Sequence, residues 1–215
     1  MSENKTILYL HGMGGGGDSR IPRLLREYFE GEPVTVVCRT YSFDPEVAVP
    51  EVAALFTELR PNLVIGESLG SIHALRLTGV PHLFVSPALG SPENLVRMAP
   101  LMHFRAGRAW ASRKWQVKPG DRQEIIWESG ILRKYREHGR AAFEAASSSG
   151  DYYYAFFGRR DHYRRSGVVS IRKWRRLFGA ESFAVYDGTH FMEEEYVRAL
   201  LVPKIREVIG LQSPQ

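Results

Sequence analysis

Short apolar runs of strand length alternate with segments of helical pattern along most of the chain, and this alternation limits the fold more than any other feature. The runs hold few polar positions, as expected of strands that are buried on both faces. Six runs are expected to be strands, at residues 6–10, 34–38, 63–66, 82–86, 152–158 and 182–186. The pattern predicts an α/β fold, in which a mostly parallel central sheet carries helices on both faces.

Segments with helical periodicity fill the connections between these runs. They are expected at residues 18–29, 50–59, 68–78 and 170–178, with a last helix from about residue 192. The first helix begins near Asp18 or Ser19, which are favourable N-terminal capping residues. The second is expected to begin at Pro50, because proline suits the first turn of a helix.

The alternation is interrupted between residues 91 and 149, a stretch that is mostly helix-forming. Trp127, Ile131 and Tyr135 fall there at helical spacing, which is typical of a stripe that faces a core. We therefore expect its aromatic residues to pack the helices onto the sheet rather than to line a pocket. A chain of 215 residues with 44% hydrophobic content suits a single domain, residues 1–215.

The formal net charge is +5, so nucleic acid and acidic partners have to be considered. The positive charge is concentrated at residues 97–140 and 158–176. Acidic residues are interleaved with both stretches or flank them, and no nucleic-acid-binding motif accompanies them. The charge pattern therefore favours a solvated surface, and we expect no nucleic-acid partner.

Cys38 is the only cysteine and follows an apolar run, which is typical of a small buried hydrophobic residue. The absence of an internal disulfide fits a reducing compartment, and we expect a cytoplasmic protein. The first residues lack the pattern of a signal peptide, and no window approaches 18 apolar residues. We therefore expect no membrane association.

Four chemically useful side chains directly follow predicted strands: His11, Ser68, Asp161 and His190. In a parallel sheet, ligands bind beyond the carboxyl ends of the strands. All four side chains are therefore expected at one edge of the sheet.

Ser68 stands between Gly66 and Gly70 at a predicted strand-to-helix turn. A serine at such a turn needs small neighbours two positions away on either side, because helix and strand crowd the backbone there. The turn projects the hydroxyl outward, and the amides that open the helix can stabilise an oxyanion. This placement indicates a nucleophile.

A serine hydroxyl needs a base, and a carboxylate must orient that base. His190 lies after the last strand, although a histidine in a surface loop would be the simpler interpretation. Asp161 follows the preceding strand, where pairing with neighbouring arginines is the competing interpretation. Asp187 is the alternative acid, but it lies only three residues before His190 and would reach the far side of its ring awkwardly.

Residues 12–17 also match the pattern G-x-G-x-x-G, and Arg39 follows at the distance of a 2′-phosphate partner. An NADP-binding protein of the Rossmann type is therefore an alternative. That fingerprint requires its glycines inside the first helical turn, whereas Asp18, Ser19 and Pro22 place the helix start after them. It also leaves the serine, aspartate and histidine unexplained.

Five segments, in this order along the chain, resemble the α/β-hydrolase superfamily, and in particular its small bacterial serine esterases: "ILYLHGMGG", "VIGESLGS", "FVSPAL", "FFGRRDHY" and "DGTHFM". The resemblance covers residues 6–88 and 152–215. It implies that Ser68 is the nucleophile, that His190 is the general base and then acid, and that Asp161 orients it.

The resemblance also implies an oxyanion hole formed by the backbone amides of Met13 and Leu69. Supporting positions are His11, Gly12, Gly66 and Gly70. No metal or organic cofactor is implied. By its position, the segment 91–149 is expected to be a helical cap insertion over the active site.

Together these features predict a cytoplasmic serine hydrolase that cleaves a small-molecule carboxylic ester or thioester through an acyl-enzyme. A second alternative is a binding module that keeps the fold and holds an acidic partner with its basic cap. Such a module would have no need of the serine, the histidine, the aspartate and the glycines together.

Overall fold

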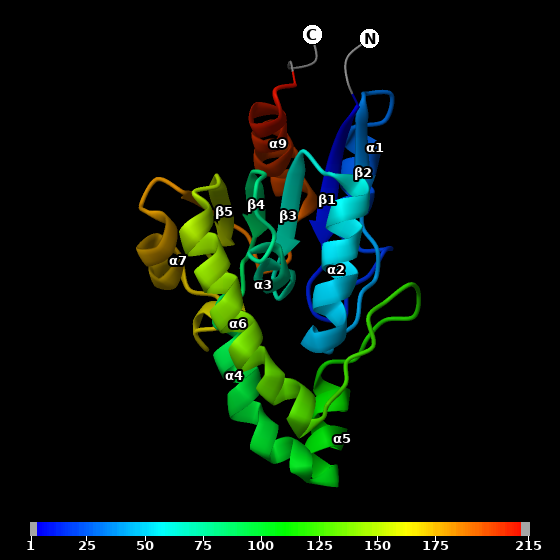
Figure 1. Cartoon of the computed structure of the whole chain (residues 1–215), viewed down its shortest axis with the longest axis vertical. Coiled ribbons are helices and arrows are strands. Elements are labelled where there is room, and N and C mark those ends of the chain that lie inside the picture. The colour runs from blue at the N-terminus through cyan, green and yellow to red at the C-terminus, as the bar shows by residue number, and fades with distance from the viewer. Residues whose placement is uncertain (1–3, 212–215) are drawn as a thin grey trace.

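The computed structural model describes residues 4–211, which contain one sheet of six parallel strands (Figure 1). The strands are β1 (Lys5–Leu10), β2 (Val34–Val37), β3 (Leu63–Glu67), β4 (His82–Val85), β5 (Tyr153–Gly158) and β6 (Phe183–Tyr186). Their spatial order is β2-β1-β3-β4-β5-β6. The predicted parallel sheet is confirmed, and the winding direction reverses between β1 and β3, where open α/β sheets form their binding crevice.

Nine α-helices lie within the described part of the chain: α1 (Arg20–Tyr28), α2 (Pro45–Leu59), α3 (Gly70–Ala74), α4 (Ser91–Met98), α5 (Arg105–Lys114), α6 (Ser129–Ser149), α7 (Ile171–Phe178), α8 (Glu194–Tyr196) and α9 (Val202–Ile209). Two short 3₁₀-helices, η1 (Ala99–His103) and η2 (His162–Arg164), and a π-helical turn, η3 (Val197–Leu201), complete them. None of the helices in residues 4–211 has both the length and the apolarity to cross a bilayer.

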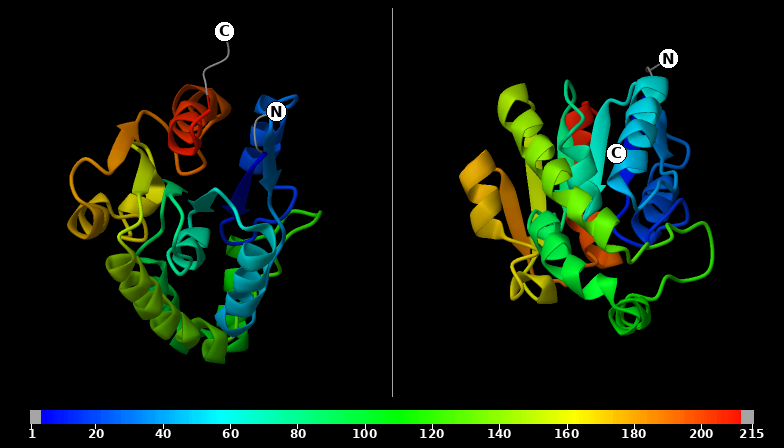
Figure 2. Two further views of the ribbon diagram at one scale, coloured as in Figure 1. Left: turned by 45° about the horizontal axis from the view of Figure 1, so that its top comes forward. Right: turned by 60° about the horizontal axis from the view of Figure 1, so that its bottom comes forward.

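The helices cover both faces of the sheet (Figure 2). Successive side chains of a strand point to opposite faces, so each strand contributes to two cores. Ile7 and Tyr9 of β1 belong to one core, which they share with α1, η3 and α9. Leu8 and Leu10 belong to the other core, which they share with α2, α3, α6 and α7. Both cores bury strand residues completely, which explains why the strands read as nearly continuous apolar runs.

The predicted start of α2 is wrong by five residues, since the helix begins at Pro45 and not at Pro50. The Asp44 side chain caps it and accepts a hydrogen bond of 3.0 Å from the Glu46 amide. Pro45 takes the first helical position, where a missing N–H costs nothing. Pro50 therefore lies inside the helix, where its ring forfeits one backbone hydrogen bond.

The helix after Ser68 is shorter than the predicted span of residues 68–78, since α3 comprises only Gly70–Ala74. Beyond it the backbone tightens, with the Arg76 and Leu77 amides donating to carbonyls three residues earlier. Gly79, at φ +90°, then turns the chain toward β4.

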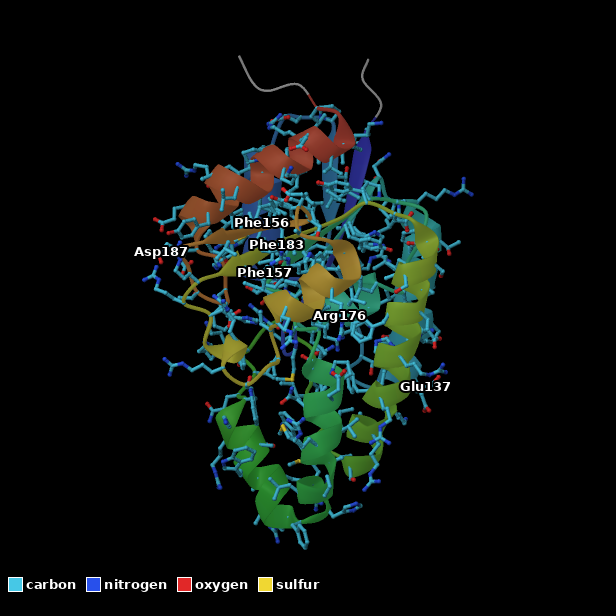
Figure 3. All side chains as sticks on the ribbon, turned by 90° about the vertical axis from the view of Figure 1, so that its left-hand side faces the viewer. Glu137, Phe156, Phe157, Arg176, Phe183 and Asp187 are labelled. Carbon is cyan, nitrogen blue, oxygen red and sulfur yellow. The ribbon has the colours of Figure 1, made fainter. Side chains whose placement is uncertain are left out.

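Residues 91–149 connect β4 to β5 and form α4, η1, α5, a long loop and α6; α4 and α5 are the green helices in Figure 3. The expected helical content is confirmed, but Trp127 precedes α6 instead of belonging to it. Its ring is buried all the same, 5.1 Å from the Trp115 ring and 6.2 Å from the Phe43 ring. Tyr135 of α6 is fully buried, and its hydroxyl donates to the Phe43 carbonyl over 2.7 Å.

Candidate active site

Ser68 occupies the tight turn between β3 and α3 with a φ of +50°, in the left-handed region that non-glycine residues rarely adopt. Three backbone hydrogen bonds fix it there. The Ser68 amide donates to the Val85 carbonyl over 3.0 Å, and the Ser68 carbonyl accepts from Ala88 and Ser71. Strain of this kind costs about 1–3 kcal/mol and persists where the surroundings over-determine the backbone.

The glycines around Ser68 allow close backbone approach, as their spacing predicted. A Cβ atom on Gly70 would lie 2.3 Å from the Leu10 carbonyl oxygen, and one on Gly66 would lie 2.9 Å from the Ser71 Cα. A Cβ atom on Gly12 would lie 3.0 Å from the Ser68 Cβ. The first helical turn therefore rests directly on the end of β1.

Replacing Gly70 by alanine is expected to lower the free energy of unfolding by about 3 kcal/mol or more, because the new methyl group collides with backbone that cannot move aside. Chemical denaturation measures the loss. Gly130→Ala is the matched control, because nothing lies within 4 Å of a Cβ atom built there. It is expected to be neutral or slightly stabilising. Equal stability of the two variants would contradict the packing argument.

The side chains of Ser68, His190 and Asp161 form one line of hydrogen bonds at this edge of the sheet. His190 Nε2 lies 2.9 Å from Ser68 Oγ, and His190 Nδ1 lies 2.8 Å from Asp161 Oδ2. The Asp161 carboxylate is completely buried and the imidazole nearly so, with side-chain exposures of 0% and 4%. With Nδ1–H donating to the carboxylate, Nε2 is left to accept from the serine hydroxyl.

The backbone after β5 holds the Asp161 carboxylate toward the histidine. Its second oxygen, Oδ1, accepts a hydrogen bond of 2.8 Å from the Tyr163 amide, and the Tyr163 ring meets the His190 ring edge-on at 4.7 Å. Asp187 lies elsewhere, exposed and 3.6 Å from the Arg160 guanidinium. Of the two candidate acids, the structure thus places Asp161 and not Asp187 against the imidazole.

Arg20, at the start of α1, fastens the loop that carries His190. Its guanidinium donates to the carbonyls of Phe191 and Met192, the two residues that follow the histidine. Met192 adopts a φ of +39°. The sequence analysis missed Arg20, because a first-turn arginine reads as a solvated side chain and its partners lie more than 170 residues away.

Leu69 directly follows the serine, and Met13 directly follows Gly12, on which a Cβ atom would lie 3.0 Å from the Ser68 Cβ. Within the described residues, the backbone amide of neither residue donates to any of the turn, loop or capping hydrogen bonds. The neighbouring His11 is fully buried and stacks on the Tyr41 ring at 4.2 Å. Burial lowers the pKa of His11 to about 4, so this imidazole stays neutral beside residues 12–17, the glycine segment.

Gln123, from the loop between α5 and α6, anchors this glycine segment. Its backbone amide donates to the Gly15 carbonyl over 2.7 Å, and its Oε1 accepts from the Gly14 amide over 3.2 Å. Its Nε2 donates to the carbonyls of Tyr41 and Ser42, each over 3.1 Å. The side chain is 3% exposed. No periodic pattern marks this loop, so the sequence offered no signal for Gln123.

Replacing Gln123 by alanine is expected to lower the free energy of unfolding by about 1–3 kcal/mol, because it leaves buried backbone groups without partners. If the glycine segment takes part in catalysis, kcat also falls about tenfold or more, because its amides lose their fixed position. Gln116→Ala, at an exposed glutamine of the same segment, is the control. Loss of stability with unchanged kcat would show that the anchor supports the fold alone.

Glu67 lies directly before the serine, and its carboxylate is bound by another residue of the sheet. Its carboxylate accepts a hydrogen bond of 2.8 Å from the hydroxyl of Tyr9, which is fully buried. Burial raises the pKa of Glu67 above its ordinary value. The Glu67 side chain, next to Ser68 in the sequence, is thus held by a hydrogen bond to Tyr9 within the sheet.

No protein-family model and no curated protein sequence matches the chain. Several solved structures, by contrast, are similar to the chain in fold. A monoacylglycerol lipase from Paleococcus ferrophilus is similar at a TM-score of 0.64 and 15% identity, over 95% of this chain and 94% of the other.

Est1E from Butyrivibrio proteoclasticus, solved with ferulic acid bound, is similar at a TM-score of 0.69 and 12% identity, over 97% and 90% of the two chains. Mouse alpha/beta hydrolase domain-containing protein 10 reaches a TM-score of 0.63 at 13% identity, over 98% and 91%. These likenesses establish the expected fold.

Proposed function

We propose that this chain, which has the α/β-hydrolase fold, is a serine hydrolase that cleaves a small-molecule carboxylic ester or thioester through an acyl-enzyme. The observation that carries the proposal is the unbroken hydrogen-bond line from Asp161 through His190 to Ser68, which ends on a serine with strained backbone. A structural role explains neither the strain nor the buried carboxylate behind the imidazole.

In the first half-reaction, Ser68 Oγ attacks the carbonyl carbon of the substrate while His190 Nε2 takes the hydroxyl proton. The Asp161 carboxylate stabilises the imidazolium that forms. The amides of Met13 and Leu69 donate to the oxyanion. The tetrahedral intermediate collapses when His190 returns the proton to the leaving alcohol or thiol, and the acyl group stays on Ser68.

In the second half-reaction, His190 takes a proton from water, and the resulting nucleophile attacks the acyl carbon. Collapse of this intermediate breaks the acyl bond to Ser68, whose oxygen recovers the proton from the imidazolium. A carboxylic acid is released. In this scheme residues 91–149 serve as the cap through which the substrate is selected.

The solved structures to which the chain is similar include a monoacylglycerol lipase and a carboxylesterase, which supports an ester as the substrate. Burial of Cys38 raises its thiol pKa to about 12, so the thiol behaves as the inert core residue that the sequence predicted. We accordingly keep the cytoplasm as the proposed location.

Two observations speak against the NADP-binding alternative. A Cβ atom on Gly16 would lie 1.8 Å from the Asp121 carbonyl oxygen, so the glycine run is covered and leaves a pyrophosphate no room. Arg39 forms a bidentate ion pair with Glu58. The non-catalytic binding module is also less favoured, since nothing in binding an acidic partner requires a buried carboxylate behind His190.

A fluorophosphonate probe tests the proposal directly. We expect stoichiometric labelling of the folded chain, mapped to Ser68 by mass spectrometry and absent in Ser68→Ala. Ser112→Ala, at an exposed serine of α5, controls for unspecific reaction and should label normally. A folded wild-type chain that takes up no probe and hydrolyses none of a series of p-nitrophenyl esters would overturn the proposal.

A further inference from the structure

The part of the chain around α5 lies at the end of the molecule opposite the two termini (Figures 1 and 3). We call residues 101–118 the basic tip. It comprises most of η1, the helix α5 and the start of the loop that leads to α6. The buried side of α5 is made by Gly107 and Ala111, and the remaining side chains of the helix are exposed.

Large apolar side chains are exposed on the basic tip. Phe104 is 66% exposed, Leu101 45% and Trp110 41%. Single exposed apolar residues are common on soluble proteins. Three of them within ten residues, at a protruding end of the molecule, form a patch of the kind that marks an interaction site.

The same segment carries five exposed cations and no carboxylate: Arg105, Arg108, Arg113, Lys114 and Lys118. Among residues 4–211, none of the five forms an ion pair. Arg108 donates to the carbonyls of Met102 and His103, and Lys114 lies 4.9 Å from the Trp110 ring. Glu128, outside the tip, lines a pocket together with Arg108. One nearby carboxylate against five cations leaves the tip with a surplus of positive charge.

We propose that the basic tip docks this protein onto an anionic phospholipid bilayer. Exposed aromatic and aliphatic side chains beside arginine and lysine are the composition of helices that lie in a membrane interface. Tryptophan prefers the headgroup level, and each juxtamembrane cation strengthens binding to anionic lipid about fivefold. This docking differs from the expectation of no membrane association, which rested on the lack of a bilayer-spanning stretch and on acidic residues interleaved with the cations of residues 97–140. Within that stretch the acidic residues begin only at Asp121.

The shape of the tip favours a lipid surface over a folded acidic partner or a nucleic acid. The tip lies at one end of the molecule (Figure 1), and its three large apolar side chains are exposed. A protein partner would need a matching pocket for each of them, whereas a bilayer accommodates them without one. A nucleic acid would bind the cations and leave Leu101 and Phe104 in water.

Docking at the tip also brings the candidate site toward the lipid. The strands end, at their carboxyl side, on the side of the molecule where α4 and α5 lie (Figure 1). The loop that leaves α5 reaches the glycine segment through Gln123. The docking proposal does not rest on the hydrolase proposal, because binding is measured without turnover.

Vesicle flotation with the full-length chain tests the docking. At low salt, we expect the protein to float with vesicles of phosphatidylcholine and phosphatidylserine, and to stay behind with vesicles of phosphatidylcholine alone. The double variant Arg105→Gln, Arg113→Gln should bind about 30-fold more weakly. Phe104→Ser, Trp110→Ser should weaken binding about tenfold or more. High salt should weaken binding by the wild type.

Matched controls separate the tip from bulk charge. Arg175→Gln, Arg176→Gln removes two exposed cations from α7, and it should bind as the wild type does. Ser68→Ala should also bind normally, even where it abolishes hydrolysis. The proposal is overturned if anionic vesicles bind no protein at low salt, if the α7 variant loses as much affinity as the tip variant, or if a single-stranded oligonucleotide competes the protein off the vesicles while the Phe104 and Trp110 variant binds normally.

Discussion

Replacement of Ser68 by alanine is expected to reduce kcat for ester hydrolysis on the order of 10⁶-fold, the scale on which serine hydrolases lose activity with their nucleophile. The reason is specific to the geometry. In the proposed mechanism the hydroxyl that His190 Nε2 contacts at 2.9 Å is the reacting group, so its removal leaves the imidazole with no hydroxyl to activate. Steady-state kinetics on an activated ester measure the loss.

In the proposed mechanism the three side chains act as one unit, so the losses caused by replacing them should not add. Ser68→Ala combined with His190→Ala is expected to be about as slow as Ser68→Ala alone. Asp161→Asn should cost about 10⁴-fold in kcat, because an amide at that position favours the wrong imidazole tautomer. Asp187→Asn is the matched control, since this carboxylate faces Arg160 instead of the imidazole. Additive losses, or equal losses in the two aspartate variants, would contradict the assignment.

Acid is expected to unfold the protein between about pH 6 and pH 4, because it buries several histidines in neutral form. Burial lowers the pKa of His11 to about 4, that of His138 to about 3 and that of His73 well below its ordinary value. The His73 and His138 rings lie 4.4 Å apart, with the Arg76 charge nearby. Within the described residues, no ring nitrogen of this pair has a hydrogen-bond partner.

The sign follows from proton uptake. The unfolded chain protonates these histidines near pH 6.5, whereas the folded chain does so only near pH 4 or below, so stability is full above pH 6.5 and falls as the pH drops. A lowering from 6.5 to about 4 costs about 3 kcal/mol for His11 alone once the unfolded state is charged. Several such groups together approach the whole stability of a domain.

Urea denaturation at a series of pH values measures this dependence. The variant His138→Phe keeps an aromatic ring and removes one titrating group, so its stability should fall less steeply with acid, by about 1.4 kcal/mol per pH unit. His162→Phe, at an exposed histidine, should leave the slope unchanged. A stability that is flat from neutral pH to pH 4 would show that the buried imidazoles do not decide the acid limit.

The strands could be predicted from the sequence because burial on both faces leaves a local mark, a continuous apolar run. The helix starts were less predictable. Pro50 and Asp44 both suit an N-terminus, and only the packed structure shows that the capping bond at Asp44 outweighs the cost of a proline inside α2. The length of α3 could not be predicted from the apolar pattern either, because the backbone leaves the α-helical hydrogen-bond pattern at Arg76 and Leu77, whose amides donate to carbonyls three residues earlier.

Some residues of the candidate site could likewise be predicted from the sequence, and others could not. Ser68, Asp161 and His190 could be named because each directly follows a strand, and the topology then brings them to one edge. Arg20 and Gln123 could not, because each works through backbone carbonyls or amides that lie far away in the chain. A side chain can bind a backbone carbonyl or amide of any residue type. Such a contact therefore leaves no pattern of residue types in the sequence from which it could be predicted.

The anchoring of the insertion at Gln123 has a consequence for engineering. A chimera that exchanged residues 91–149 would seem to need only two joins, at the end of β4 and the start of β5. The segment has a third attachment, because residues 121–123 bind the glycine segment after β1. A donor segment without this third attachment would leave the Gly14 amide and the Tyr41 carbonyl without hydrogen-bond partners, so the segment is transferable only together with residues 121–123.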